Sequence, residues 1–277
     1  MTDLRIFSYL PNPRLWKATI AARLGGVDLD LRGAKPGELQ DWLWDFDARP
    51  LTAADRRSPE NTARQARTGF TGELHKTAAF LETQPFATVP AAFSPDGTTG
   101  IFESNSIMRA VARVGGDRAA LYGADPYTAS RIDSFLDASL VFARDGQIYL
   151  LALRAGDLTP EIHERVAGAF ATYMSGIEAA LAGDRAFLVG DALTLADICF
   201  VAEIALFSRE RVYGAQLEAQ DLDPIHNDDL AATYPGAVAH YARLCAHDAF
   251  APDVAPYLRR LDDEIARGRR PRQAVGH

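Results

Sequence analysis

The chain has 277 residues, of which 48% are hydrophobic, so it is long enough for one or two domains with apolar cores. Its formal net charge of −8 argues against nucleic acid as a partner, because the phosphates would be repelled. Two cysteines, Cys199 and Cys245, are too few for a disulfide framework or a cysteine-rich metal site, which fits a reducing compartment.

No segment has the pattern of a secretory signal or of a membrane-spanning helix. Residues 1–7 lack a basic start and a long apolar core, and the longest apolar stretches, residues 136–153 and 195–207, are interrupted by charged side chains. We therefore expect a soluble, cytoplasmic protein without membrane contact. Residues 267–277 carry a basic run, which we interpret as a flexible, solvated tail rather than a binding patch.

The chain opens with the pattern of a strand, a helix and a second strand. Residues 4–7 form a short apolar strand that ends before two prolines, and residues 13–23 follow helical spacing up to the glycine pair at 25–26. Residues 27–31 alternate apolar and acidic side chains, as in a half-buried strand. The short connections predict a β-α-β unit with parallel strands.

Residues 33–74 have no clear periodicity, and we treat them as an insertion. The segment is polar and contains several prolines, yet it carries the large aromatic residues Trp42, Trp44 and Phe46. We predict a short helix over residues 38–44, because an unstructured connection of this length is unusual in a compact domain. The aromatic side chains would cover a ligand site, pack on their own domain or contact a second subunit.

After the insertion, order resumes with a predicted helix over residues 75–82 and strands over 89–93 and 101–102. Ser104 or Asn105 is expected to cap the helix that follows and runs to Val114.

Beyond the glycine pair at 115–116 the pattern is entirely helical. We predict helices over residues 125–154, 159–181, 194–207, 237–246 and 255–266, and leave open an interruption of the first at Gly146. The predicted fold class is an α/β domain over residues 1–116, with the insertion, followed by an all-α domain over residues 125–266.

Three motifs have the residue types of a ligand site, and each also has a purely structural interpretation. The first is Val89-Pro90 at the start of a strand. Proline cannot donate a hydrogen bond to a neighbouring strand. The motif therefore either marks an edge strand or leaves the backbone of Val89 free to bind a ligand.

The second motif is FESNSI at residues 102–107, where a strand passes into a helix. Its polar side chains either cap the helix or form an anion site, in which the free N–H groups of the first turn and the hydroxyl of Ser104 bind a carboxylate. Glu103 would then pair with an ammonium group. Together the two residues would suit the headgroup of an amino acid.

The third motif is SYLPNPR at residues 8–14, between the first strand and the first helix. Open α/β sheets bind ligands at such a junction. Asn12 alternatively serves only as the cap of the helix.

In this order the motifs resemble those of the cytosolic glutathione transferases. The more specific part is FLVGDALTLADI at residues 187–198, which resembles the family's buried capping box, with Thr194 paired to Asp197. The resemblance covers residues 4–32 and 75–255. Within the family, NPRLWKATIAA at residues 12–22 is most similar to the transferase-like domain of elongation factor 1B gamma, and the bacterial glutathione-dependent ether-cleaving transferases are another relative to consider.

The resemblance implies a thioredoxin-like domain that binds glutathione as co-substrate, followed by an all-helical domain that shapes the pocket of a second substrate. Pro90 would be cis, and the backbone of Val89 would pair with the cysteinyl unit of glutathione. Glu103 and Ser104 would hold the γ-glutamyl amine and carboxylate. Many bacterial and plant members place a catalytic serine just before a Pro-Asn pair, but here that position is Leu10.

We therefore expect another group to stabilise the glutathione thiolate, with Asn12 as first choice and Ser8 or Tyr9 as second choices. The thiolate would attack a small hydrophobic or aromatic electrophile, by conjugation or by thiolytic ether cleavage, in detoxification or aromatic catabolism. The alternative is a non-catalytic binding or assembly module, as in the elongation factor subunit.

A dimer is expected because the family is usually dimeric. No metal site is predicted, because no histidine pair has ligand spacing.

Overall fold

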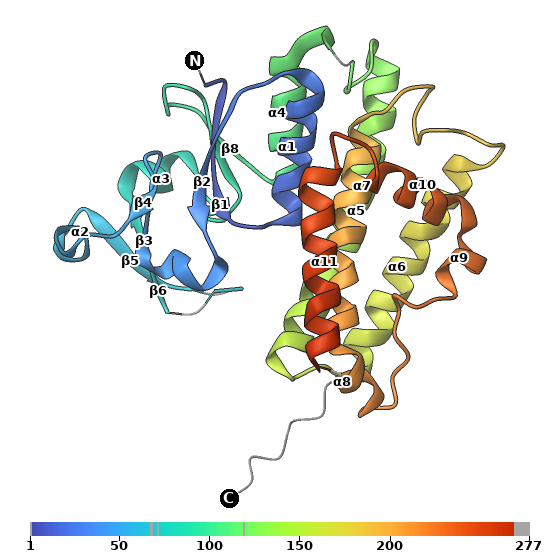
Figure 1. The fold of residues 1–277 in the computed structure, drawn as a ribbon. Coiled ribbons are helices and arrows are strands. Elements are labelled where there is room, and N and C mark those ends of the chain that lie inside the picture. The colour runs from blue at the N-terminus through green and yellow to red at the C-terminus, as the bar shows by residue number, and fades with distance from the viewer. Residues whose placement is uncertain (1, 67–68, 71, 119, 269–277) are drawn as a thin grey trace, which may run out of the picture. The chain divides into compact units, whose positions relative to one another are not determined.

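The computed structural model describes residues 2–66, 69–70, 72–118 and 120–268, and Figure 1 traces their elements. The chain divides into two compact units between Ala124 and Asp125. The first unit is mixed α/β and the second is all-helical, as predicted. Most of the predicted basic tail, from residue 269 onward, lies outside the described residues.

The first sheet has the strand order β2-β1-β7-β8. Its strands are β1 (Leu4–Tyr9), β2 (Leu29–Ala34), β7 (Ala91–Phe93) and β8 (Gly100–Phe102). β1 and β2 are parallel and are joined by helix α1 (Pro13–Gly25), which confirms the predicted β-α-β unit. β7 runs antiparallel to both β1 and β8. Helix α4 (Ser104–Gly115) packs against α1, which completes a thioredoxin-like topology.

Strand β1 is buried on both faces of the sheet. Successive side chains of a strand point to opposite faces, so Ile6 and Ser8 share one face and Phe7 lies on the other. Ile6 and Phe7 are both fully buried. Phe7 belongs to an aromatic cluster with Trp44 and Phe80. Burial on both faces explains why this strand has consecutive apolar residues instead of an alternating pattern.

The insertion builds a second four-stranded sheet, with the order β4-β3-β6-β5. Its elements are the 3-10 helix η1 (Pro36–Asp41), β3 (Trp42–Trp44), β4 (Arg49–Pro50), α2 (Ala53–Arg57), β5 (Asn61–Gln65) and β6 (Glu73–Thr77). β3 pairs parallel with β6, and β5 pairs antiparallel with β6. β3 and β6 come from opposite ends of the segment, so no local sequence pattern predicts their pairing.

Two helix predictions in this region are wrong in part. The helix expected over residues 38–44 ends at Asp41, and Trp42–Trp44 are extended in β3. The helix expected over residues 75–82 begins three residues later, as α3 (Ala78–Thr83), because Glu73–Thr77 form β6. In both cases pairing with a remote strand overrides the local preference.

The insertion packs on its own unit through aromatic side chains. Trp44 is 1% exposed, and its ring lies edge-on to Phe7 with centroids 5.3 Å apart. Its indole N–H donates to the carbonyl of Leu39 at 3.1 Å. Phe46 packs edge-on against Phe93 at 5.6 Å. Of the roles left open for these aromatic residues, packing on their own domain is the one that the structure shows.

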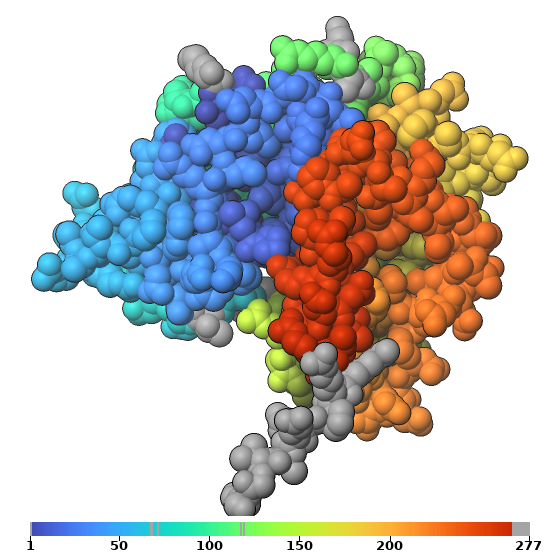
Figure 2. Space-filling view, in the orientation of Figure 1, coloured from blue at the N-terminus to red at the C-terminus, as the bar shows by residue number. Residues whose placement is uncertain are grey.

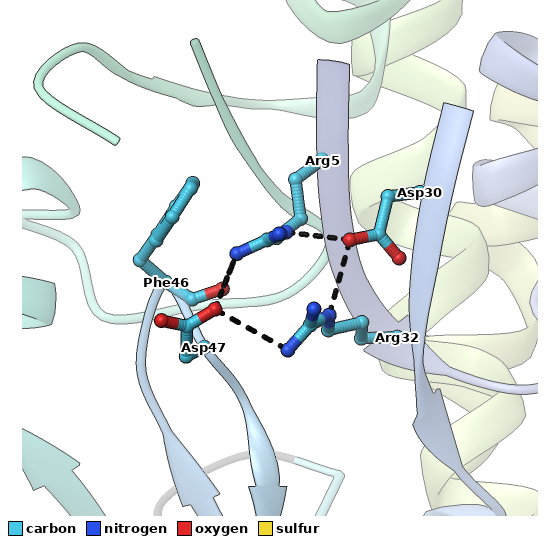
Figure 3. Close-up of polar contacts among 5 residues, drawn as sticks. All are labelled: Arg5, Asp30, Arg32, Phe46 and Asp47. Carbon is cyan, nitrogen blue, oxygen red and sulfur yellow. Dashed lines mark hydrogen bonds and ion pairs between the residues drawn. The ribbon is translucent and has the colours of Figure 1, made fainter. Parts of the chain in front are cut away.

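An ion-pair network joins the insertion to the first sheet (Figure 3). Arg5 of β1 contacts Asp30 at 2.6 Å and Asp47 of the insertion at 2.5 Å, and its guanidinium lies 4.0 Å from the ring centroid of Phe46. Arg32 of β2 reaches the same two carboxylates at 3.2 and 3.4 Å. Such networks stabilise more than isolated surface pairs, because each charge is held by two partners.

The second unit is a bundle of helices around α7. Its elements are α5 (Pro126–Ala155), α6 (Pro160–Leu181), α7 (Leu195–Phe207), the 3-10 helix η3 (Ser208–Tyr213), α8 (Gly214–Glu218), α9 (Leu230–Thr233), α10 (Pro235–Cys245) and α11 (Ala251–Gly268). Almost every residue of α7 is buried. α11 covers one side of this unit and is visible as the red surface in Figure 2. None of the helices in the described residues combines the length and the apolar character of a bilayer span.

Helix α5 is continuous through Gly146, so the helix has no interruption there. A Cβ added at Gly146 would make an ordinary van der Waals contact with Phe207, at 3.7 Å. Phe142 and Tyr149 are buried on either side of it and pack against Phe207 with ring centroids 5.3 and 6.0 Å apart. These two aromatic residues belong to the core of the second unit.

The predicted capping box of α7 is present and is part of a larger buried network. The carboxylate of Asp197 accepts hydrogen bonds from the backbone N–H groups of Thr194 and Leu188, at 2.9 and 3.0 Å. His240 of α10 places Nε2 2.9 Å from the same carboxylate, and Arg243 contacts the other ring nitrogen at 2.8 Å. A buried carboxylate needs such partners to offset its lost hydration.

Gly33 is expected not to tolerate a side chain. It pairs with Ser8, has φ of +150°, and a Cβ added there would overlap the carbonyl oxygen of Ser8. We expect Gly33→Ala to lower the free energy of unfolding by about 1–3 kcal/mol in urea titrations. The matched control is Gly37→Ala, because open space surrounds that position. Equal losses in the two variants would contradict the prediction.

Candidate functional site

Three segments that carry the predicted site residues meet at one end of the first sheet. Phe7 pairs with Ala91, and Ala91 pairs with Phe102. Because β7 is antiparallel to both neighbours, the C-terminal ends of β1 and β8 lie beside the start of β7. Residues 8–12, 89–90 and 103–104 therefore share one edge of the sheet, although they are far apart in the chain.

Asn12 and Ser8 form a buried pair at the start of α1. Asn12 is the N-cap residue, and its side-chain oxygen accepts from the N–H of Arg14 at 3.0 Å. Its side-chain nitrogen donates to the hydroxyl of Ser8, also at 3.0 Å. Both residues are 1% exposed. The structure thus places Asn12 as a helix cap and brings it together with Ser8.

Tyr9 lies on the opposite face of β1 from Ser8. Its ring is edge-on to Phe70 of the insertion, with centroids 6.1 Å apart. It packs against the aromatic cluster around Trp44. The three predicted catalytic residues are therefore not one group: Ser8 and Asn12 are adjacent, and Tyr9 is separated from them by the sheet.

The Val89–Pro90 peptide bond is cis, as the resemblance implied. Val89 is half-buried and packs against the aromatic cluster, whereas Pro90 is buried. A second cis bond joins Leu10 to Pro11 in the loop before α1.

Glu103 precedes α4 and has an unusual backbone conformation. Its φ is +66°, which is uncommon for a residue other than glycine. It is the N-cap residue, so the expectation that Ser104 or Asn105 caps this helix is wrong. Within the described residues, the Glu103 side chain makes no capping hydrogen bond. Glu103 is exposed, while Ser104 is 7% exposed and lies in the first turn of the helix.

Sequence reasoning missed Lys17, a fully buried lysine in α1. Its ammonium nitrogen lies 2.7 Å from the side-chain oxygen of Asn105 and 3.4 Å from the hydroxyl oxygen of Ser104. Lysine is almost never fully buried unless it is paired. The available signal was this one lysine in LWKATIAA at residues 15–22, where Thr19 is the other polar residue.

Sequence reasoning also missed Lys76 of β6. Its ammonium donates to the carbonyl of Ala87 at 2.6 Å, two residues before Val89, and lies 4.2 Å from the ring centroid of Trp44. Burial, and to a smaller extent the charge of Arg64, lower the pKa of Lys76 from 10.5 to about 8. Lys76 therefore supports the loop that leads into the Val89–Pro90 segment.

No group of three or more histidine, cysteine, aspartate or glutamate side chains is arranged to hold a metal ion in the part of the chain that the structure describes. The polar atoms at this edge of the sheet instead offer hydrogen-bond donors, one exposed carboxylate and a buried cation.

Sequence comparison relates the chain to two groups of proteins. Residues 158–248 match the family model for the C-terminal domain of glutathione S-transferase. A probable elongation factor 1-gamma of Arabidopsis thaliana is 31% identical over 137 residues, which are 49% of this chain and 32% of that protein. The glutathione S-transferase-like protein FUS3 of Gibberella moniliformis is 24% identical over 247 residues, 88% of each protein. The match thus spans about a third of the length of the elongation factor relatives.

Solved structures share the fold. A glutathione S-transferase of Methylobacterium radiotolerans, in complex with glutathione sulfonate, has a TM-score of 0.59 and 20% identity, and the match covers 91% of this chain and 95% of that one. The thioredoxin-like unit and the helical unit are those of a glutathione transferase fold. The chain therefore has the glutathione transferase fold, carries the C-terminal domain of that family over residues 158–248, and is similar in sequence to elongation factor 1-gamma over part of its length.

The lowered pKa of Lys76 predicts a pH dependence of stability. Between about pH 8 and its ordinary pKa of 10.5, the unfolded chain retains a proton that the folded chain has released. The free energy of unfolding of the wild type should therefore rise with pH across this window, relative to Lys76→Met. Urea titrations of both proteins at pH 7 and pH 9.5 measure the difference. An identical difference at the two pH values would contradict the prediction.

Proposed function

We propose that the chain is a glutathione transferase, which binds glutathione at the edge of the first sheet and uses its thiolate to attack a small hydrophobic or aromatic electrophile. The observation that carries the proposal is the convergence of Val89, Glu103 and Ser104 with the start of α1, in a chain whose residues 158–248 match the C-terminal domain of glutathione S-transferase. In this assignment residues 1–116 are the glutathione-binding domain and residues 125–266 contribute the pocket of the electrophile.

The γ-glutamyl headgroup is assigned to the start of α4. The exposed carboxylate of Glu103 would bind the ammonium group, and the hydroxyl of Ser104 with the first N–H groups of the helix would bind the carboxylate. The positive φ of Glu103 costs on the order of 1–3 kcal/mol, and backbone strain of this kind is concentrated at ligand sites. The backbone of Val89 would bind the cysteinyl unit as an added strand.

The thiolate is assigned to the first turn of α1. Leu10 has no hydroxyl to offer, so the donor must come from a neighbouring group. Asn12 and Ser8 support the assignment because they are adjacent and are fixed by the hydrogen bond that the Asn12 amide donates to the Ser8 hydroxyl. A serine hydroxyl has one donor and an amide nitrogen has two, so each group can donate to sulfur. The positive end of the α1 dipole would add to the stabilisation.

Three further properties follow from the family and are proposed with the activity. We expect a dimer, a cytoplasmic location, and a reaction of detoxification or aromatic catabolism, by conjugation or by thiolytic ether cleavage. The structure from Methylobacterium radiotolerans, whose ligand is glutathione sulfonate, supports glutathione as the class of ligand.

A second candidate is a non-catalytic binding or assembly module. The 31% identity to an elongation factor 1-gamma over 137 residues favours it, as does leucine at position 10. Glutathione binding without turnover of any electrophile would favour this second candidate.

Binding is tested with Ser104→Ala. We expect the wild type to be retained on immobilised glutathione and Ser104→Ala to bind about tenfold or more weakly, because a hydrogen bond to a charged group contributes about 1.5–3 kcal/mol. Ser106→Ala, two residues further along the same helix, is the control and should bind like the wild type. The proposal fails if calorimetry detects no complex between the wild type and millimolar glutathione.

The thiolate donor is identified by titrating bound glutathione, whose thiolate absorbs in the ultraviolet. Loss of the donor should raise the pKa of the bound thiol by about one to two units. We expect this shift in Asn12→Ala, and compare it with Ser8→Ala and Tyr9→Phe. If the pKa of the thiol is the same in all three variants and the wild type, none of these side chains is the donor.

A further inference from the structure

Lys17 places a positive charge in the buried stretch of α1, which runs from residue 15 to residue 22. The residue is fully buried, and its neighbours in the chain, Trp16 and Ala18, are 3% and 2% exposed. Burying an ammonium group costs free energy unless it gains partners. Its contacts with Ser104 and Asn105 are both at the start of α4, which is the segment assigned to the glutathione headgroup.

The donor and the acceptor in the hydrogen bond between the ammonium group of Lys17 and the hydroxyl of Ser104 follow from the chemistry of the two groups. An ammonium group has three donors and no acceptor, whereas a serine hydroxyl has one donor and two acceptor positions. The hydroxyl oxygen of Ser104 must therefore accept from Lys17. Its single hydrogen remains available to donate to another acceptor.

The contact with Asn105 has a related consequence. The side-chain oxygen of Asn105 accepts from Lys17 at 2.7 Å. This hydrogen bond ties the first turn of α4 to the buried cation of α1. The cation also adds positive charge beneath the N-terminus of α4, where the helix dipole is already positive.

We infer that Lys17 is a positioning residue for an anion: it orients the hydroxyl of Ser104 as a hydrogen-bond donor and adds charge, so that the first turn of α4 selects a ligand carboxylate over a neutral group. The inference rests on the proposed function, because the carboxylate in question is that of the γ-glutamyl unit of glutathione. Lys17 acts through Ser104 and does not itself contact the ligand.

A purely structural role is the competing explanation. In that case Lys17 only holds α1 against α4. Its removal would lower the stability of the fold and would lower the affinity for all ligands by the same factor. The two roles differ in selectivity, because only an electrostatic and orienting role depends on the charge of the ligand. The test therefore compares two ligands that differ in one charge.

The ligands are glutathione and its analogue in which the γ-glutamyl α-carboxylate is replaced by a carboxamide, and calorimetry gives both dissociation constants. For the wild type we expect the analogue to bind about tenfold or more weakly, as for the loss of one charge-assisted hydrogen bond. In Lys17→Met we expect glutathione to bind about tenfold more weakly and the ratio between the two ligands to fall towards one. An unchanged ratio in Lys17→Met would overturn the inference.

The control variant is Ile20→Val, which also alters a fully buried side chain of α1. It should leave the ratio between the two ligands at the wild-type value even where it lowers stability. If Lys17→Met does not fold, Lys17→Arg and Lys17→Gln replace it: the arginine variant should keep the ratio and the glutamine variant should lower it. Equal ratios in these two variants would overturn the inference.

Failure of the proposed function has a different signature. If the wild type binds neither ligand, the glutathione site itself is wrong. If the wild type binds both ligands equally, a glutathione site remains but its carboxylate does not lie at Ser104, and the role of Lys17 is overturned alone.

Discussion

Burial of strand β1 on both faces is the constraint on which the first unit depends. Ile6 and Phe7 are fully buried on opposite faces, so the sheet needs a cover on each side. Helices α1 and α4 pack together as one layer, and the aromatic residues of the insertion form the cluster around Phe7. Because this strand is central, its register with β7 decides which loops meet at the end of the sheet, and so where the site lies.

The site combines an apolar frame with a few polar groups whose partners are largely fixed. Asn12 caps α1 and binds Ser8, and Lys17 binds the first turn of α4. Glu103 is by contrast exposed and held at positive φ. The buried polar groups have partners within the protein, which offset their lost hydration, whereas the exposed carboxylate of Glu103 remains open to solvent.

The insertion contacts residues next to the candidate site. Through Phe70 it packs against Tyr9, and Lys76, in β6, the last strand of the second sheet along the chain, contacts the loop before Val89. The ion pairs of Arg5 and Arg32 join it to the first sheet. In the second unit the buried carboxylate of Asp197 organises the start of the central helix, because it binds both the nearby backbone N–H of Leu188 and the ring of His240 on α10.

The sequence by itself determined the features that depend on local pattern. These were the β-α-β start, the long helices of the second unit and the capping box of α7, because caps, prolines and helical periodicity act over a few residues. Tertiary structure alone decided the parallel pairing in the second sheet, since β3 and β6 pair across about thirty residues. The structure also decided that α5 continues through Gly146, which the local pattern left open. It also decided the partners of Lys17, because nothing in the chain near residue 17 predicts that a buried ammonium will meet an amide oxygen on another helix.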